Sequence, residues 1–209
     1  MQKVYIKFPE ISNIKSNITS RKQSDETTQI ILDRTIFMPK STYLLADKGN
    51  ISGMEIIAIE EKRDNIIHLV KGKPEKSEVS LNLDIDIRNR NLTYNTCLIL
   101  FKILMTSYYN FSDIKLELTE DRAKFIVSEF DDLFYEDLIV DQLNFLISKN
   151  IKIDNNQGIS SVHPIGEVIN NEIAFDNAGK VLGFRINNTT YEDNTLMIDF
   201  TAGSDLFMN

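Results

Sequence analysis

A change in hydrophobic period near the middle of the chain constrains its fold more than any other feature. Residues 79–87 alternate apolar and polar side chains, which is typical of a half-buried strand. Residues 92–108 are apolar on nearly every side, so this segment is either a buried helix or a long strand, and its length favours the helix. The change divides the chain into a β-rich part, residues 1–85, and an α+β part, residues 86–209.

The first part has the pattern of a small β-barrel. Residues 54–60 and 66–70 are apolar runs separated by a polar turn, which predicts a hairpin, and residues 29–33 form a further short run. Several short strands joined by turns are typical of barrels. The polar residues 12–28 are expected to form a loop.

The second part predicts a mixed domain. Residues 113–118 alternate as a strand, and Thr119 with the acidic residues after it has the pattern of a helix N-cap. We therefore expect one helix from Thr119 to about Phe134 and a second over residues 136–148, followed by strands from Val168 onward. The predicted fold class is α+β: a small N-terminal β-barrel, then a domain with a buried helix, a helical hairpin and an antiparallel sheet.

Composition argues against several classes of function, although the net charge alone leaves a local basic surface open. The net charge of −8 and the absence of a long basic run argue against extensive phosphate binding, and the densest positive segments, residues 71–73 and 88–90, have the pattern of solvated loop charges. The chain has no apolar run long enough to cross a membrane, and a single cysteine, Cys97, fits a reducing cytoplasm. We therefore expect a cytoplasmic protein without a membrane partner.

The sequence also lacks the common catalytic patterns. There is no Gly-x-Ser-x-Gly elbow and no glycine-rich phosphate loop. Cys97 lies within the predicted buried helix, where a thiol is inert. The proximity of His163 to Ser160 and Ser161 is sequence proximity only, and a triad also needs a third, orienting group.

Five segments together resemble one family. Residues 32–53 combine Asp33-Arg34-Thr35-Ile36-Phe37-Met38-Pro39 with Asp47-Lys48-Gly49, and residues 86–96, 119–151 (the family's helical hairpin), 177–186 and 196–203 follow in a matching order. This resembles the editing domain of alanyl-tRNA synthetases and the free-standing trans-editing deacylases. In that family the first segment has a Gly-Gly-Gln centre, and here Thr42-Tyr43-Leu44 stands in its place.

The resemblance implies a zinc site that this sequence does not reproduce. In the family, two histidines at i and i+4 on the buried helix and a Cys-x-x-x-His pair hold one zinc ion. They align here with Asn95, Ile99, Asn170 and Ala174, none of which is a usual zinc ligand. A shifted alignment of the second pair to His163 and Glu167 recovers two ligands and leaves the helix without any. We therefore expect no metal and no other cofactor.

Two main hypotheses of function follow from the resemblance. The first is a non-catalytic binding module that uses Thr35, Asp47, Asn95 and Asn170 for a small polar ligand, a protein partner or, weakly, a tRNA acceptor end. The second is a trans-editing hydrolase that deacylates mischarged alanine tRNA without zinc, through water oriented by Asn95, Asn170, Thr35 or the tRNA itself. A third hypothesis is a structural partner in a larger assembly.

Overall fold

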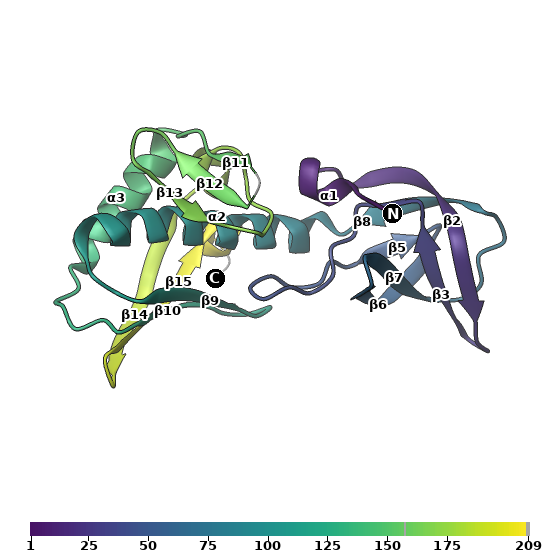
Figure 1. Cartoon of the computed structure of the whole chain (residues 1–209), viewed down its shortest axis with the longest axis horizontal. Helices are drawn as coiled ribbons and strands as arrows, with labels where there is room; N and C mark the ends of the chain where they lie inside the picture. Colours follow the sequence, from purple (N-terminus) through teal and green to yellow (C-terminus); the bar gives the residue numbers. More distant parts are fainter. Residues whose placement is uncertain (157, 208–209) are drawn as a thin grey trace. The chain divides into compact units, whose positions relative to one another are not determined.

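The chain folds into two structural units in this computed structural model, which describes residues 1–156 and 158–207. Unit 1 is Met1–Asn89 and unit 2 is Arg90–Asn209, so the boundary falls within helix α2 (Ile85–Tyr108). Figure 1 shows strands in both units and helices beside the sheet of unit 2. The fold is a mixture of helices and sheets, which confirms the predicted α+β class.

Strands dominate unit 1. Six of them are hydrogen-bonded in the closed order β2-β3-β7-β6-β5-β8, and β1 pairs with β4 beside them. The elements are β1 (Gln2–Lys3), α1 (Val4–Lys7), β2 (Asn13–Gln23), β3 (Thr27–Leu32), β4 (Arg34–Thr35), β5 (Gly49–Ile51), β6 (Met54–Lys62), β7 (Asn65–Lys71) and β8 (Glu78–Leu83). The predicted hairpin is confirmed as β6–β7, whose turn places Arg63 and Asp64 at positive φ.

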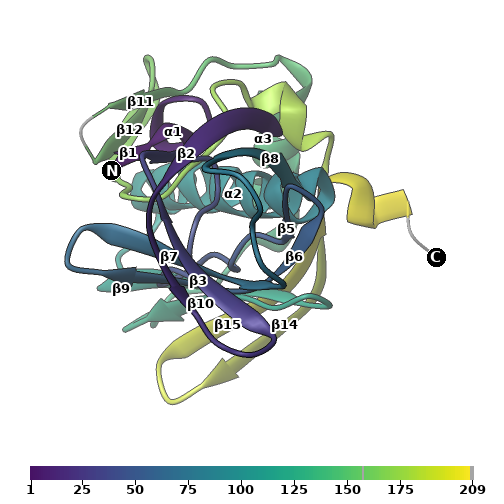
Figure 2. The same cartoon turned by 90° about the vertical axis from the view of Figure 1, so that its right-hand side faces the viewer.

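Strand β2 lies where the sequence predicts a loop, and that prediction was wrong. Its first half pairs with β8 and its second half with β3, with a register shift between Ile18 and Ser20. Such a bulge bends a strand, and β2 is visibly long and curved (Figures 1 and 2). Most of its side chains are exposed, so backbone pairing on both edges forms this strand without an apolar pattern.

A buried ion pair joins four segments of unit 1. The Arg88 and Asp47 side chains are fully buried and paired, and Arg88 Nε donates to Asp47 Oδ1 at 3.1 Å. Arg88 also donates to the carbonyls of Pro9 and Ile36, and Asp47 Oδ2 accepts the Met38 N–H at 2.6 Å. The interpretation of Arg88 as a solvated loop charge was therefore wrong, since this residue is the arginine that the core of unit 1 surrounds.

A buried histidine forms the second polar group of this core. His68 Nδ1 lies 3.3 Å from the Ile30 carbonyl, and its Nε2 lies 2.9 Å from Thr35 Oγ1. A carbonyl can only accept, so Nδ1 carries the proton and Nε2 accepts the Thr35 hydroxyl, which in turn accepts the Phe37 N–H. Burial lowers the pKa of His68 to about 4, so the ring is neutral at pH 7.

The described residues of unit 2 contain two of the three α-helices expected for the second half, together with two antiparallel sheets in the orders β14-β15-β10-β9 and β11-β12-β13. Residues 91–101 of α2 are all buried, which confirms a helix that is enclosed on every side. Phe101 stacks on Phe125 of the sheet at 4.3 Å between ring centroids. The other elements are β9 (Asp113–Leu118), β10 (Ala123–Ser128), α3 (Glu136–Ser148), β11 (Asp154–Asn156), β12 (Ile159–Val162), β13 (Gly166–Ile169), η1 (Ala178–Val181), β14 (Phe184–Glu192), β15 (Thr195–Ala202) and η2 (Gly203–Phe207).

The predicted helical hairpin was wrong, because only its second helix, α3, exists. Residues after Thr119 form β10, which pairs with β9 and β15. Thr119 Oγ1 accepts the Arg122 N–H at 3.0 Å, so the expected N-cap is instead part of a tight turn between two strands. Alternate residues Ala123, Phe125 and Val127 are buried, which is a period of two rather than 3.6.

The strand predicted over residues 79–87 was too long. Strand β8 ends at Leu83, and α2 begins at Ile85. Asp84 accounts for the change, because its carboxylate accepts the Asp86 N–H at 3.1 Å and its carbonyl accepts the Arg88 N–H. The alternation of apolar and polar residues thus continues past Leu83 into the first turn of α2. The Asp84 side chain caps this turn and marks where the helix begins.

We predict that Arg88→Met lowers the free energy of unfolding by about 3–5 kcal/mol, because it leaves the buried Asp47 carboxylate without its partner. The matched control is Lys15→Met, which removes an exposed ion pair with Glu78 and should cost about 0–1 kcal/mol. Urea unfolding measures both. Equal effects of the two variants would show that the Arg88–Asp47 pair contributes no more than a surface pair.

We also predict that His68 makes the protein less stable in mild acid. Its pKa falls from 6.5 to about 4 on folding, so the unfolded chain binds more protons between these values. The neutral His68 ring therefore contributes fully to the free energy of unfolding above about pH 6.5. This contribution is lost as the pH falls towards 4, and the free energy of unfolding is lower by about 2 kcal/mol at pH 5.

The measurement is urea unfolding of the natural chain and His68→Gln at pH 7 and pH 5. The loss between the two pH values should be about 2 kcal/mol smaller in His68→Gln. The control is His163→Gln, which removes the exposed histidine. A similar pH dependence in the natural chain and His68→Gln would contradict the prediction.

Candidate functional site

Two asparagines connect α2 to the segment that follows β13. Asn95 Nδ2 donates to Asn170 Oδ1 at 3.1 Å and to the Ile173 carbonyl at 3.0 Å. Asn170 Nδ2 donates in turn to Ser160 Oγ and to the Glu172 carbonyl, both at 2.9 Å. Because Asn170 also accepts the Glu172 N–H, its amide is held from both ends.

The network extends through further polar side chains. Ser160 Oγ donates to Asn155 Oδ1, and Asn155 Nδ2 donates to the Phe175 carbonyl at 3.1 Å. Thr96, next to Asn95, accepts the Phe175 N–H at 3.0 Å while its hydroxyl donates to the Leu92 carbonyl. Sequence reasoning missed Thr96, Asn155 and Ser160. The cluster of asparagines at 155, 156, 170 and 171 is the signal that could have pointed to them.

One buried acceptor in this network has no partner in the protein. Asn95 is fully buried. Among the buried side-chain nitrogen and oxygen atoms of residues 1–156 and 158–207, its Oδ1 is the one that has no hydrogen-bond partner within the protein. The orientation of the amide is fixed, because the Ile173 carbonyl needs a donor and therefore faces Nδ2. An unsatisfied buried acceptor costs about 1–3 kcal/mol, so this atom is suited to receive an N–H or O–H group.

The residues at the aligned zinc positions do not fit a zinc ion. Ile99 and Ala174 are buried and carry no donor atom, and both asparagines are occupied with each other and with backbone carbonyls. His163 and Glu167, the shifted alternative, are exposed. Within the described part of the chain, no group of three or more His, Cys, Asp or Glu side chains could hold a metal ion.

Cys97 has the inert character expected of a core thiol. Its side chain is fully buried on α2, and burial raises the pKa of the thiol. A thiol at neutral pH in such surroundings is neither a nucleophile nor a metal ligand.

Thr35 and Asp47 are structural groups in unit 1. Thr35 bonds His68 and the Phe37 N–H, while Asp47 bonds Arg88 and the Met38 N–H. Their side chains thus hold the backbone of one segment of unit 1, whereas Asn95 and Asn170 bond each other within unit 2. A ligand-binding role for all four residues stays a prediction.

The Asp-x-Gly pattern at residues 47–49 also has a structural cause. Gly49 has φ +151°, and a Cβ there would lie 2.3 Å from the Asn82 carbonyl oxygen. No other residue fits this close approach of β5 to β8. The centre of the same loop is a turn in which Ser41 and Leu44 bond each other, with Leu44 buried beneath it.

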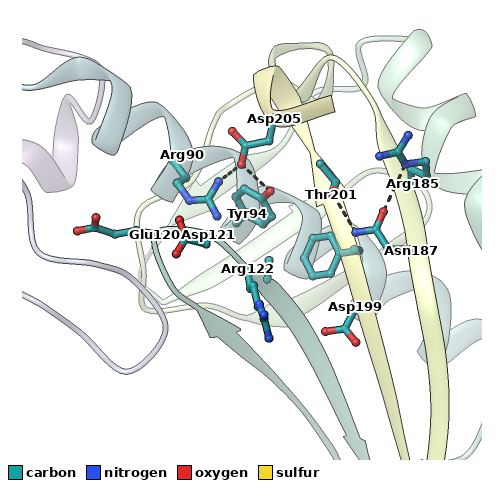
Figure 3. A pocket seen from close by; sticks show the side chains of 12 residues that line it. Arg90, Tyr94, Glu120, Asp121, Arg122, Arg185, Asn187, Asp199, Thr201 and Asp205 are labelled. Atoms are coloured by element: carbon teal, nitrogen blue, oxygen red, sulfur yellow. Dashed lines mark hydrogen bonds and ion pairs between the residues drawn. The ribbon is translucent and has the colours of Figure 1, made fainter. Parts of the chain in front are cut away.

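A charged cleft lies elsewhere in unit 2 (Figure 3). It has a volume of about 600 Å³ and includes Arg90, Tyr94, Arg122, Arg185 and Asp205. Tyr94 donates to Asp205 at 2.8 Å, and Arg90 pairs with Asp205 and lies 4.6 Å from the Tyr94 ring centroid. Burial raises the pKa of Tyr94. Arg90, Tyr94 and Asp205 bond one another, so they connect α2 to η2 rather than form an acid–base pair.

No helix among the described residues is both long enough and apolar enough to cross a membrane.

Comparison with known proteins supports the resemblance seen in the sequence. No family model matches the chain. The alanyl-tRNA editing protein AlaX-L of Pyrococcus horikoshii is 28% identical over 136 residues, covering 61% of this chain and 34% of that protein. AlaX-M of the same organism is 36% identical over 72 residues, covering 32% of this chain and 33% of that protein. The chain thus spans about a third of the length of the relatives it matches. These two matches show that the chain is similar, over part of its length, to alanyl-tRNA editing proteins.

Proposed function

We propose that this chain is an alanyl-tRNA editing-like binding module that holds its site together with an amide pair and does not hydrolyse its ligand. The observation that carries this proposal is the Asn95–Asn170 hydrogen bond of 3.1 Å, at the positions that align with family zinc ligands. Metal-assisted hydrolysis needs an ion that orients the substrate and activates water. The amide and hydrocarbon groups at these positions supply neither function.

The unpaired Asn95 Oδ1 gives the module a recognition atom. A buried acceptor favours a ligand that presents an N–H or O–H group, since the bond removes the cost of leaving the atom unsatisfied. Asn170, Ser160 and Glu172 restrain the surrounding groups, so little ordering is required on binding. We propose a small polar ligand or a tRNA acceptor end as the occupant.

Charge favours a small ligand over extensive tRNA contact. Unit 2 carries 9 Lys and Arg against 18 Asp and Glu, whereas unit 1 carries 14 against 13. Phosphate binding depends on neutralisation by cations, so unit 2 disfavours a nucleic-acid backbone. Any binding of tRNA should accordingly be weak and sensitive to salt.

The same unpaired atom favours one alternative, a zinc-independent deacylase. Asn95 Oδ1 could accept a hydrogen bond from an attacking water, which would orient it without a metal ion. Deacylation would also need a general base to activate the water. The Cys97 thiol is inert and His163 is exposed, so neither side chain supports this alternative.

We predict that the amide pair stabilises unit 2. In a double-mutant cycle with Asn95→Ala and Asn170→Ala, the interaction free energy should be about 1 kcal/mol. Added zinc or a chelator should leave each melting temperature unchanged. An interaction free energy of zero would mean that the hydrogen bond does not connect the two segments energetically, and stabilisation by about one equivalent of zinc would contradict the metal-free site.

We further predict no hydrolysis of alanine tRNA charged with serine or glycine. The measurement is a deacylation time course with protein in excess, with and without Zn²⁺, compared with buffer alone and with Asn95→Ala. The rates with the natural chain, with the natural chain and Zn²⁺, with Asn95→Ala and with buffer alone should all agree. Turnover above the buffer rate that Asn95→Ala abolishes would replace the binding module with the zinc-independent deacylase.

A further inference from the structure

An exposed apolar surface lies away from the amide pair, around the loop between β10 and α3. Tyr108 at the end of α2, Tyr191 near the tip of the β14–β15 hairpin, and three residues of the loop and α3 make up what we call the tyrosine patch. Its members and their exposed fractions are Tyr108 (47%), Leu133 (63%), Tyr135 (57%), Leu138 (37%) and Tyr191 (52%). Large apolar groups gathered on one surface commonly mark a protein interface, and tyrosine is enriched there.

Hydrogen bonds and ring contacts connect the segments that carry the three tyrosines of the patch. The Tyr109 hydroxyl accepts the Tyr135 N–H at 2.9 Å, and the Tyr191 hydroxyl accepts the Phe134 N–H at 3.2 Å. The Tyr108 and Tyr109 ring centroids lie 6.4 Å apart. Beneath the patch lie the buried rings of Tyr109, Phe130 and Phe134. Phe130 packs edge to face on both of the others, and the Tyr109 and Phe134 rings are tilted at 43°, so the exposed groups rest on a packed base. Such a surface loses little conformational freedom when it binds.

The loop between β10 and α3, α3 itself and the tip of the β14–β15 hairpin carry acidic side chains and no Lys or Arg. Residues 125–148 contain six acidic residues and no lysine or arginine, and residues 186–207 also lack both cations. Asp131, Asp132 and Asp137 are exposed in the loop or at the start of α3, and Glu192 and Asp193 adjoin Tyr191. Lys102, six residues before Tyr108 on α2, has its Nζ 4.0 Å from Asp113 Oδ1 and so is paired with an acidic residue. The patch is therefore apolar at its centre and acidic at its rim.

We propose that the tyrosine patch docks a basic protein segment that carries apolar side chains. Charge complementarity selects this occupant, because the acidic rim repels nucleic acid and anionic lipid and equally repels the same patch of a second copy. The apolar side chains of the segment contact the tyrosines and leucines, and its Lys and Arg contact the rim. This interaction is independent of the site at Asn95 and of any hydrolytic activity.

The test uses a synthetic peptide of about 18 residues in which Lys and Leu form an amphipathic helix. Two control peptides replace every Lys by Glu or every Leu by Ser. Calorimetry gives the dissociation constant, and amide chemical shifts in NMR locate the site. Only the Lys/Leu peptide should bind tightly, its shifts should centre on the patch, and its affinity should fall between about 0.05 and 0.5 M salt.

Variants separate the two components of the surface. Leu133→Ser with Tyr135→Ser should weaken binding at least about tenfold. Its control is Leu182→Ser with Phe207→Ser, which removes side chains of similar exposure just after η1 and at the end of η2 (62% and 74%) and should leave binding unchanged. Asp131→Asn with Asp137→Asn should flatten the salt dependence, whereas Asp25→Asn with Glu75→Gln in unit 1 should not.

Other outcomes would overturn the proposal. Equal binding of all three peptides, or shifts away from the patch, would remove it even if a variant failed to fold, since these measurements use the natural chain. Self-association in sedimentation that Leu133→Ser with Tyr135→Ser abolishes would identify a second copy as the occupant. Displacement of the peptide by tRNA, with shifts at the same residues, would identify a nucleic-acid surface instead.

Discussion

The buried ion pair of Arg88 and Asp47 is the interaction on which unit 1 depends. A charge enclosed in protein is tolerated only when its partner and its remaining hydrogen bonds are supplied. Arg88 meets this requirement with Asp47 and the carbonyls of Pro9 and Ile36, which come from three different parts of the chain. The closed arrangement of the strands brings these groups together and satisfies the buried charges. Thr35, His68 and Gly49 complete the same core through polar contacts and close backbone approach.

This core explains why part of the family-like sequence frame persists where the zinc-ligand residues are absent. Thr35, Asp47 and Gly49 are required by the fold of unit 1, whether or not the chain acts on a substrate. Asn95 and Asn170 belong to a different set of interactions, in which two amides restrain each other and one acceptor is left over. A retained motif is therefore evidence for the retained fold, and the site has to be judged by its own chemistry.

The sequence predicted those elements for which hydrophobic pattern and length together favour one structure. Residues 91–101 are buried on every side, and α3 is amphipathic, so both helices could be expected. Strand β2 is polar because it is exposed, so only its pairing with β8 and β3 reveals it. Thr119 has the chemistry of an N-cap and forms a turn instead, which local sequence cannot distinguish. Likewise, the burial of Arg88 depends on carbonyls distant in the chain, and the partnership of Asn95 with Asn170 spans 75 positions.

The amide pair has a consequence for how the protein depends on its surroundings. A zinc site needs deprotonated ligands and competes with every other protein for a scarce ion, so its occupancy follows acidity and metal supply. Carboxamides do not titrate, and they take up no ion. The connection from α2 to the segment after β13 is therefore present as soon as the chain has folded, without any loading step. A cell could deplete or flood its zinc pool and leave this connection as it was.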